Sequence, residues 1–271
     1  MKNILNTQKR EDVLVLTSKP YGSVLIKAVQ ILDFLSERDE PQMMKAISDN
    51  TNMTLPTTNK ILDTLELVGF VSRNQETKEY SLGPRLIQLA NASFIQFDIV
   101  RETYPALKRL FETVGTTVNL GMLQGDEVLF INKFTVSDTS NKTLSRIGFT
   151  QPIYCSAMGK AMLSTFSLED RKKYFNQVEL TPNTKYTITN KKELEKQLIN
   201  IEEKGYATDD REAEDNIYCI GTTFETSNDN GHYAFSISIP YHLLTEEKYD
   251  FLVSELIKTK NVIEYQLANL K

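Results

Sequence analysis

The sequence predicts an α+β fold in two domains that are joined by a single helix. Its 271 residues are more than one compact core usually needs and are comfortable for two. The composition is that of a globular protein, with 40% hydrophobic and 25% charged residues. The spacing of the apolar residues changes from helical to alternating near residue 70 and again near residue 116. Each change marks a point at which a run of helices gives way to strands.

Composition also limits the classes of function. The net charge of −5 gives no overall basic surface, so any nucleic-acid binding must come from a local one. Cys155 and Cys219 lie far apart and match no zinc spacing, and with only two histidines we expect no metal and no cofactor. No run of 18 apolar residues occurs, and the N-terminus lacks the apolar core of a signal peptide. We therefore expect a cytoplasmic protein that does not associate with membranes.

Residues 1–20 are expected to form a flexible arm that ends at a turn-like stretch containing Pro20 and Gly22. Ser23 then opens a helix as its expected N-cap, and this helix runs through Ser36. Its apolar stripe consists of Val24, Ala28, Ile31, Leu32 and Leu35. Pro41 suits the first turn of a second, short helix. The buried face of that helix is expected to consist of Met43, Met44 and Ile47.

A third helix is expected to start near residues 55–57 and to stop at Gly69. Its apolar stripe consists of Ile61, Leu62, Leu65 and Val68. Beyond Gly69, residues 70–71 and 80–82 are predicted as two strands around a loop at 76–78. Three short helices and a β-hairpin within residues 21–83 make a winged helix-turn-helix, a fold that binds DNA.

Residues 84–98 are predicted to form a linker helix. Its apolar or small residues recur at alternating spacings of three and four, and they are Leu86, Leu89, Ala90, Ser93 and Phe97. Such a narrow stripe suits a seam between two helices, so we expect the linker to pair with its copy in a homodimer.

Residues 99–271 are predicted to form one sheet, rich in antiparallel pairs, with helices packed on it. Helices are expected at 99–114, 156–166, 168–175, 190–204 and 245–267. Strands are expected at 116–124, 127–134, 206–209, 217–225 and 232–240, with Gly125-Asp126 as the turn between the first two.

A helix-turn-helix places the first residues of its second helix in the major groove. The candidates for base contacts are Thr57, Thr58, Asn59 and Lys60. Arg73 and Lys78 in the hairpin are positioned to meet backbone phosphates. Residues 18–90 contain eight Lys or Arg against nine Asp or Glu, whereas DNA-binding domains are usually basic. A winged helix that makes only protein contacts therefore remains the alternative.

The strands at 217–225 and 232–240 each pair a bulky face with a face of small side chains. The small faces consist of Cys219, Gly221 and Thr223 on the first strand and Ala234, Ser236 and Ser238 on the second. Small polar side chains leave room and offer hydrogen bonds, so we predict a ligand pocket on this side. The alternative is that Ser236 and Ser238 face solvent and Cys219 is a small buried hydrophobe. Lys160 is expected to pair with a neighbouring acid.

Several segments in a fixed order carry a resemblance to a known family. They are Ser23-Val24 with Ile31-Leu32, Leu55–Thr58, Leu65–Val71, Tyr80–Leu86, Ser156–Ala161, Gly205–Asp210, Tyr218–Gly221 and Phe235–Pro240. Together they resemble the IclR-type transcriptional regulators over about residues 22–268. The resemblance implies a winged helix-turn-helix joined by a helix to an effector domain of GAF-like fold. It also implies homodimers, or dimers of dimers, on double-stranded operator DNA.

The resemblance further implies a small organic-acid effector, and we expect a repressor. By this resemblance, the backbone amides of Ala157, Met158 and Gly159 would hold the carboxylate of the ligand at the start of a helix. The positions that would contact the rest of the ligand are Asp209, Cys219, Ser236 and Ser238. The sequence departs from the family pattern after Asp210, where it continues Arg211-Glu212-Ala213-Glu214 rather than with the usual acidic pair.

Two other classes of function remain as alternatives, a small-molecule sensor or scaffold that does not bind DNA and, less favoured, an enzyme. Ser156 and Lys160 are one residue too far apart for a Ser-x-x-Lys motif. The remaining nucleophile candidate is a Cys219–His232 pair on neighbouring strands. We therefore assign no catalytic residue.

Overall fold

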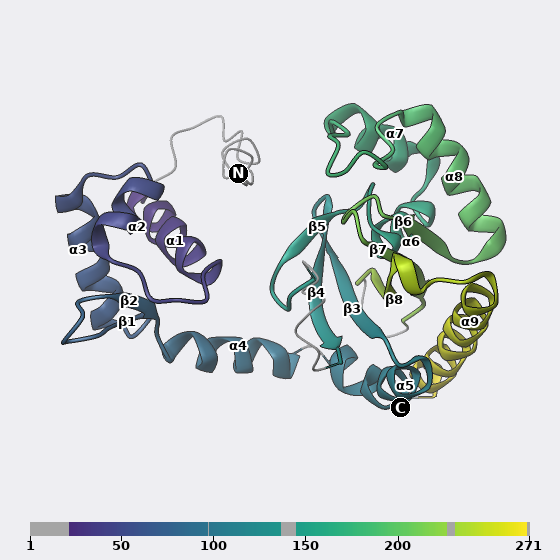
Figure 1. Cartoon of the computed structure of the whole chain (residues 1–271), viewed down its shortest axis with the longest axis horizontal. Helices are drawn as coiled ribbons and strands as arrows, with labels where there is room; N and C mark the ends of the chain where they lie inside the picture. The colour runs from purple at the N-terminus through teal and green to yellow at the C-terminus, as the bar shows by residue number, and fades with distance from the viewer. Residues whose placement is uncertain (1–21, 97, 137–144, 227–230, 270–271) are drawn as a thin grey trace. The chain divides into compact units, whose positions relative to one another are not determined.

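The computed structural model describes residues 22–96, 98–136, 145–226 and 231–269 (Figure 1). The chain divides into two compact units, residues 1–96 and 97–271. The predicted arm at 1–20 and Phe97 of the predicted seam lie outside the described residues. In the ranges that the structure describes, no helix has both the length and the apolar character needed to cross a membrane.

The N-terminal unit contains four helices and a two-stranded antiparallel sheet among its described residues. The helices are α1 (Ser23–Ser36), α2 (Met44–Asn50), α3 (Leu55–Leu67) and α4 (Arg85–Gln96). The strands are β1 (Val71–Arg73) and β2 (Tyr80–Leu82). Thr54 caps α3, because its hydroxyl accepts from the Thr57 amide, and Gly69 follows the helix with a φ of 78° that favours glycine.

One core holds this unit together, and α1, α2, α3 and the hairpin all contribute to it. Its buried members are Ile31, Phe34, Leu35, Ile47, Ile61, Leu62, Leu65, Val71 and Tyr80. The packing therefore produces the predicted winged helix-turn-helix. Residues 85–96 form the predicted linker helix α4.

Several details of the predicted N-terminal unit were wrong. Gly22 rather than Ser23 is the N-cap of α1, in the left-handed conformation and without a side-chain cap. Val24 is 56% exposed, because α1 buries the face that carries Ile31, Phe34 and Leu35 near its C-terminal end.

The start of α2 was also predicted too early. Gln42 exchanges two backbone hydrogen bonds of 2.8 Å with Tyr80, so the chain after Pro41 is extended and α2 begins only at Met44. Met43 and Val68, expected to be buried, are 51% and 48% exposed.

The C-terminal unit is built on a six-stranded antiparallel sheet with the order β5-β4-β3-β8-β7-β6. The strands are β3 (Thr117–Gln124), β4 (Glu127–Phe134), β5 (Thr150–Pro152), β6 (Ala207–Asp210), β7 (Ile217–Phe224) and β8 (Tyr233–Pro240). The helices are α5 (Asp98–Val114), α6 (Ala157–Ser164), α7 (Leu168–Gln177), α8 (Lys191–Lys204) and α9 (Glu246–Ala268), with the short 3-10 helix η2 (Tyr241–Leu243). The predicted strands and helices all occur, and within the described residues of this unit the two short elements β5 and η2 were missed.

Separate cores cover the two faces of this sheet. The bulky face of β7 and β8 packs with α5 and α9, which lie side by side (Figure 1). The opposite face packs with α6, and α8 lies against α6. The small side chains of β7 and β8 therefore face α6, as the alternation along the two strands predicts.

A β-bulge in β4 changes which of its residues share a face. Gly121 pairs with Phe130 and Leu120 with Asn132, so Ile131 is the extra residue. Phe130 and Lys133 therefore lie on the same side of the sheet, the side of the small residues, although strict alternation would put them on opposite sides.

Candidate functional site

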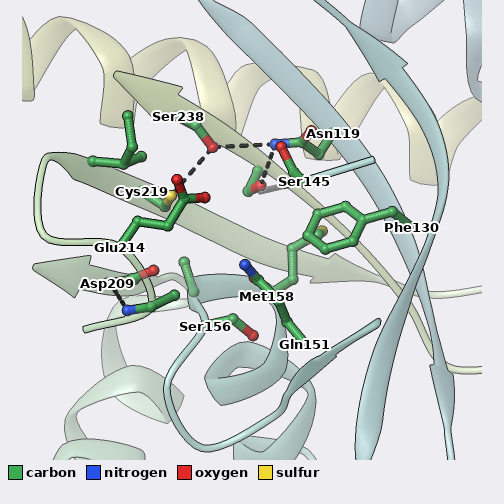
Figure 2. Close-up of a pocket in the computed structure, with 14 residues that line it drawn as sticks. Asn119, Phe130, Ser145, Gln151, Ser156, Met158, Asp209, Glu214, Cys219 and Ser238 are labelled. Carbon is green, nitrogen blue, oxygen red and sulfur yellow. Dashed lines mark hydrogen bonds between the residues drawn. The ribbon is translucent and has the colours of Figure 1, made fainter. Parts of the chain in front are cut away.

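A pocket lies between the small-residue face of the sheet and the start of α6. The lining residues are Asn119, Phe130, Ser145, Gln151, Ser156, Ala157, Met158, Asp209, Ala213, Glu214, Ile217, Cys219, Ser236 and Ser238. Figure 2 shows most of these side chains converging on one space from β3, β4, β7, β8 and the start of α6. The space between these walls measures about 370 Å³ when the part open to solvent is included.

The strand register explains why these residues meet. Asp209 is opposite Cys219, and Cys219 is opposite Ser238, so their side chains project to one face in a row across β6, β7 and β8. Gly221 is opposite Ser236. A Cβ atom at Gly221 would lie 2.9 Å from the backbone nitrogen of Met158, so glycine is what allows α6 to approach the sheet here.

Hydrogen bonds join the polar groups on the floor of the pocket (Figure 2). The Cys219 Sγ lies 3.1 Å from the Ser238 Oγ, and the Asn119 Nδ2 donates to that same hydroxyl at 3.1 Å. Ser236 and Ser238 are 3% and 5% exposed, so they do not face solvent. The Asn119 Oδ1 is buried and has no hydrogen-bond partner among the described residues. It is an acceptor that a ligand donor could satisfy.

Asp209 is buried against the pocket and holds the following segment in place. Its Oδ1 accepts from the backbone amides of Glu212 and Ala213, at 2.6 and 3.3 Å. Burial raises the pKa of Asp209 to about 7, although Lys160 opposes this effect. The carboxyl group therefore changes its protonation state near neutral pH.

Lys160 is 1% exposed and forms an ion pair with Glu212, as the sequence led us to expect. Its Nζ also donates to the Gln197 Oε1 at 3.1 Å. Burial raises the pKa of Glu212, and Lys160 opposes that rise. The pair connects α6 to the segment that carries Glu214. Neither Lys160 nor Glu212 lines the pocket.

The start of α6 supplies only part of the predicted anion site. Ala157 and Met158 line the pocket, but Gly159 does not. The Gly159 amide donates to the Ser156 hydroxyl at 3.1 Å, and a Cβ atom on Gly159 would lie 2.3 Å from the Ile153 Cα. Gly159 therefore packs against Ile153, while the other predicted effector-binding positions all line the pocket.

The structure adds lining residues that sequence reasoning missed. Asn119 could have been noticed, since it is a polar residue within a strand that is otherwise largely apolar. Phe130 was hidden by the bulge in β4, which no sequence pattern indicates. Glu214 lies on a segment without regular structure, so the periodicity of the sequence could not place it.

The structure also separates the members of the candidate catalytic pair. Cys219 is opposite Ser238, six residues from His232, or roughly 20 Å along the strand. The His232 ring packs against Phe166 with a centroid distance of 6.0 Å. Burial raises the pKa of the Cys219 thiol well above its ordinary value, so the thiol stays neutral. In the described ranges, no three His, Cys, Asp or Glu side chains gather as metal ligands.

In the N-terminal unit, the predicted base-reading residues differ in accessibility. Lys60 is exposed, and Asn59 is half-buried with its amide donating to the Asp63 carboxylate at 2.9 Å. The half-buried Thr57 has its hydroxyl 2.9 Å from that of Thr54. Thr58 is fully buried and donates to the Thr54 carbonyl, which corrects the expectation that it touches a base.

The hairpin places its two predicted phosphate contacts differently. Lys78 is exposed at the loop, with a φ of 62°, and its amide donates to the Asn74 carbonyl at 2.9 Å. Arg73 is half-buried on β1, with its guanidinium 5.3 Å from the centre of the Tyr80 ring. Lys60 and Lys78 are therefore the exposed residues among the predicted DNA contacts.

Comparison with family models matches both units. Residues 24–75 match the IclR helix-turn-helix domain, and residues 91–265 match the bacterial transcriptional regulator IclR C-terminal domain. The HTH-type transcriptional regulator KdgR of Escherichia coli (strain K12) is 28% identical over 246 residues, which cover 91% of this chain and 93% of that protein.

Solved structures give the same result. The Thermotoga maritima IclR is 31% identical with a TM-score of 0.75, and the match covers 91% of this chain and 99% of that one. An IclR homologue from Microbacterium hydrocarbonoxydans, crystallised as a complex with 4-hydroxybenzoate, shares the fold at 21% identity with a TM-score of 0.77. That match covers 91% of this chain and 100% of the other.

Proposed function

The chain belongs to the IclR family of bacterial transcriptional regulators, and we propose that it is a repressor whose operator binding is controlled by a small organic acid. It combines a helix-turn-helix DNA-binding domain with an IclR effector-binding domain. Members of this family are transcriptional regulators rather than enzymes. The proposal concerns the chemical class of the ligand, the direction of regulation, and the residues that bind the ligand and the DNA.

The observation that carries the proposal is the pocket at the start of α6. The first backbone amides of a helix attract an anion, and Ala157 and Met158 place theirs at the pocket. The thiol of Cys219, the hydroxyl of Ser238 and the amide of Asn119 line the opposite wall. The carboxylate of an organic acid would meet the amides of α6, and the polar remainder of the molecule would form hydrogen bonds with the groups on the sheet. The similar protein complexed with 4-hydroxybenzoate supports an organic acid as the ligand.

Regulation requires that ligand binding and DNA binding share a coupling free energy, typically about 1–3 kcal/mol. The helix α4 lies between the helix-turn-helix and the effector unit along the chain. We propose that the ligand changes the placement of the two DNA-reading helices of a homodimer through α4. The spacing of these helices then fits the two half-sites of an operator better or worse.

The first experiment is a salt titration of binding to the intergenic DNA upstream of the protein's own gene, with a scrambled duplex for comparison. We expect selective binding with a steep dependence on salt, and we expect it to weaken strongly when the exposed Lys60 and Lys78 are both changed to Ala. The matched control is Lys172→Ala with Lys192→Ala, which removes two charges from the effector unit. Equal, weak binding to both duplexes would favour the sensor that does not bind DNA.

A further inference from the structure

Glu214 is a feature of the pocket that the proposed function does not use. Its side chain projects into the space between the sheet and α6 (Figure 2). Asp209 lines the same space, and none of the described lining residues is Lys, Arg or His. A pocket for an organic acid thus contains two carboxyl groups of its own. This inference rests on the proposed function and concerns the class of acid that the pocket accepts.

The segment that carries Glu214 is firmly held. The Glu212 side chain pairs with Lys160, and its carbonyl accepts from the Thr187 hydroxyl at 2.7 Å. The Arg211 guanidinium lies 3.9 and 3.7 Å from the ring centres of Tyr186 and Tyr241. Glu214 follows Glu212 by two residues, so these anchors hold the backbone of Glu214 beside the pocket.

The charge of Glu214 affects groups on two different strands of the sheet. It acts on the Cys219 thiol on β7 and on Lys133 on β4, whose pKa burial lowers and Glu214 raises. The Lys133 Nζ donates to the carbonyl and the hydroxyl of Ser145, at 2.5 and 3.1 Å, so it lies behind a lining residue. The charge of Glu214 therefore partly offsets that of Lys133 beside this wall of the pocket.

Asn119 supplies a second, independent indication of the ligand. It is 1% exposed and lines the pocket, and its Oδ1 has no hydrogen-bond partner among the described residues. Both Asn119 Oδ1 and the Glu214 carboxylate accept hydrogen bonds and cannot donate them. The far end of the ligand should therefore carry hydrogen-bond donors, whereas the carboxylate end meets the amides of α6.

We propose that the pocket selects monocarboxylic acids that carry a hydroxyl group at the opposite end, and that Glu214 excludes dicarboxylic acids. A second carboxylate would lie beside Glu214 in a partly enclosed site, where like charges repel strongly. A hydroxyl group at the same position would donate to Glu214 or to Asn119. Selection by repulsion of the wrong ligand is a common source of specificity.

The test measures the affinity of the full-length protein for matched acids by calorimetry. One set is 4-hydroxybenzoate, terephthalate and benzoate, in which the hydroxyl group is kept, replaced by a carboxylate or removed. A second set is gluconate and glucarate. In the wild type we expect the hydroxy monoacid of at least one set to bind at least tenfold more tightly than its diacid.

The variant Glu214→Gln should lower this preference at least tenfold by improving binding of the diacid, because the repulsion is lost and Lys133 then favours the second carboxylate. Asp215→Asn is the matched control, since it removes the same charge from the neighbouring exposed residue and should leave the preference unchanged. Asn119→Ala should reduce the advantage of 4-hydroxybenzoate over benzoate. Circular dichroism checks that each variant is folded.

An unchanged preference in folded Glu214→Gln, or no binding of either hydroxy monoacid to the wild type, would overturn this inference. These results differ from a failure of the proposed function. If monoacids bind and alter operator affinity while Glu214→Gln behaves as the wild type, regulation stands and the role of Glu214 falls. If the wild type shows no selective DNA binding but Glu214→Gln binds the diacids more tightly, the role of Glu214 stands and the proposed regulation falls.

Discussion

At the scale of single residues, buried charged groups determine the shape of the effector pocket. Lys160, Asp209 and Glu212 are all nearly inaccessible, and Lys160 lies close enough to oppose the rise in the pKa of both carboxyl groups. Because a buried charge without a partner is costly, these groups hold α6 and the 209–213 segment in one arrangement. The pocket is therefore positioned by an ionic network, of which Asp209 lines the pocket and Lys160 and Glu212 do not.

Asp209 makes the stability of the protein depend on pH in a definite direction. Its pKa rises from an ordinary value of 3.8 to about 7 on folding, so between these values the folded state binds a proton that the unfolded state has lost. Stability contributed by this group is therefore lost as pH rises from about 4 to about 7. Asp209→Asn keeps an oxygen acceptor for the two amides and does not titrate.

We expect the unfolding free energy of Asp209→Asn to rise relative to wild type across this pH window, by up to on the order of 4 kcal/mol, and to level off above it. Urea unfolding at several pH values measures the difference. Asn216→Ala changes a nearby exposed residue that does not titrate and should show a flat difference. A flat difference for Asp209→Asn as well would mean that Asp209 is charged throughout.

At the scale of the elements, the bulge in β4 and the linker α4 have the largest functional consequences. The bulge brings Phe130 to the pocket side of the sheet and leaves Lys133 on the same side. The helix α4 spans Arg85–Gln96 and lies next to the effector unit in the chain, which makes it the covalent route for any signal. A defect inside this helix should therefore impair regulation without removing either function.

Ser93→Pro tests this role of α4. Proline removes a backbone hydrogen bond and clashes with the preceding turn, at a cost of about 3 kcal/mol or more in a helix interior. We expect an effector that changes operator affinity by about tenfold in the wild type to change it less than twofold in this variant. Ser93→Ala is the control that preserves the helix. Full regulation in Ser93→Pro would rule out the linker mechanism.

At the scale of the whole molecule, exposed apolar side chains in the N-terminal unit favour a homodimer. On α4, Ile87 and Leu89 are 73% and 45% exposed, and on α1 Leu25 and Val29 are 69% and 53% exposed. Apolar side chains that gather on a surface are often covered by a partner. Leu89 belongs to the stripe that the sequence predicts as a helix seam.

We expect the protein to sediment as a dimer or as a dimer of dimers, and Leu89→Glu to shift it toward smaller species. Because two half-sites are then no longer bound together, operator affinity should fall at least tenfold. Leu168→Glu provides a control on α7, where the side chain is 70% exposed outside the predicted seam. Analytical ultracentrifugation measures the first effect. A Leu89→Glu variant that sediments as the wild type would exclude the seam from the interface.

The sequence alone determined the order of the elements and the side of the sheet that holds the pocket. These features depend on local spacing, since the alternation in β7 and β8 already separates bulky from small side chains, and Gly69 marks the end of α3. The same spacing placed Cys219, Ser236 and Ser238 on the small-residue faces of their strands, whereas Asp209 was indicated only by the resemblance to the family.

Only the tertiary structure decided which individual groups are accessible and which meet. Thr58 belongs to the buried face of α3, and the Gly159 amide is used by Ser156, because packing and capping claim groups that a motif leaves open. Phe130 reaches the pocket through a bulge, and Glu214 through a segment anchored by distant residues. These contacts join parts of the chain that are far apart in sequence, so no periodic pattern of residues along the chain reveals them.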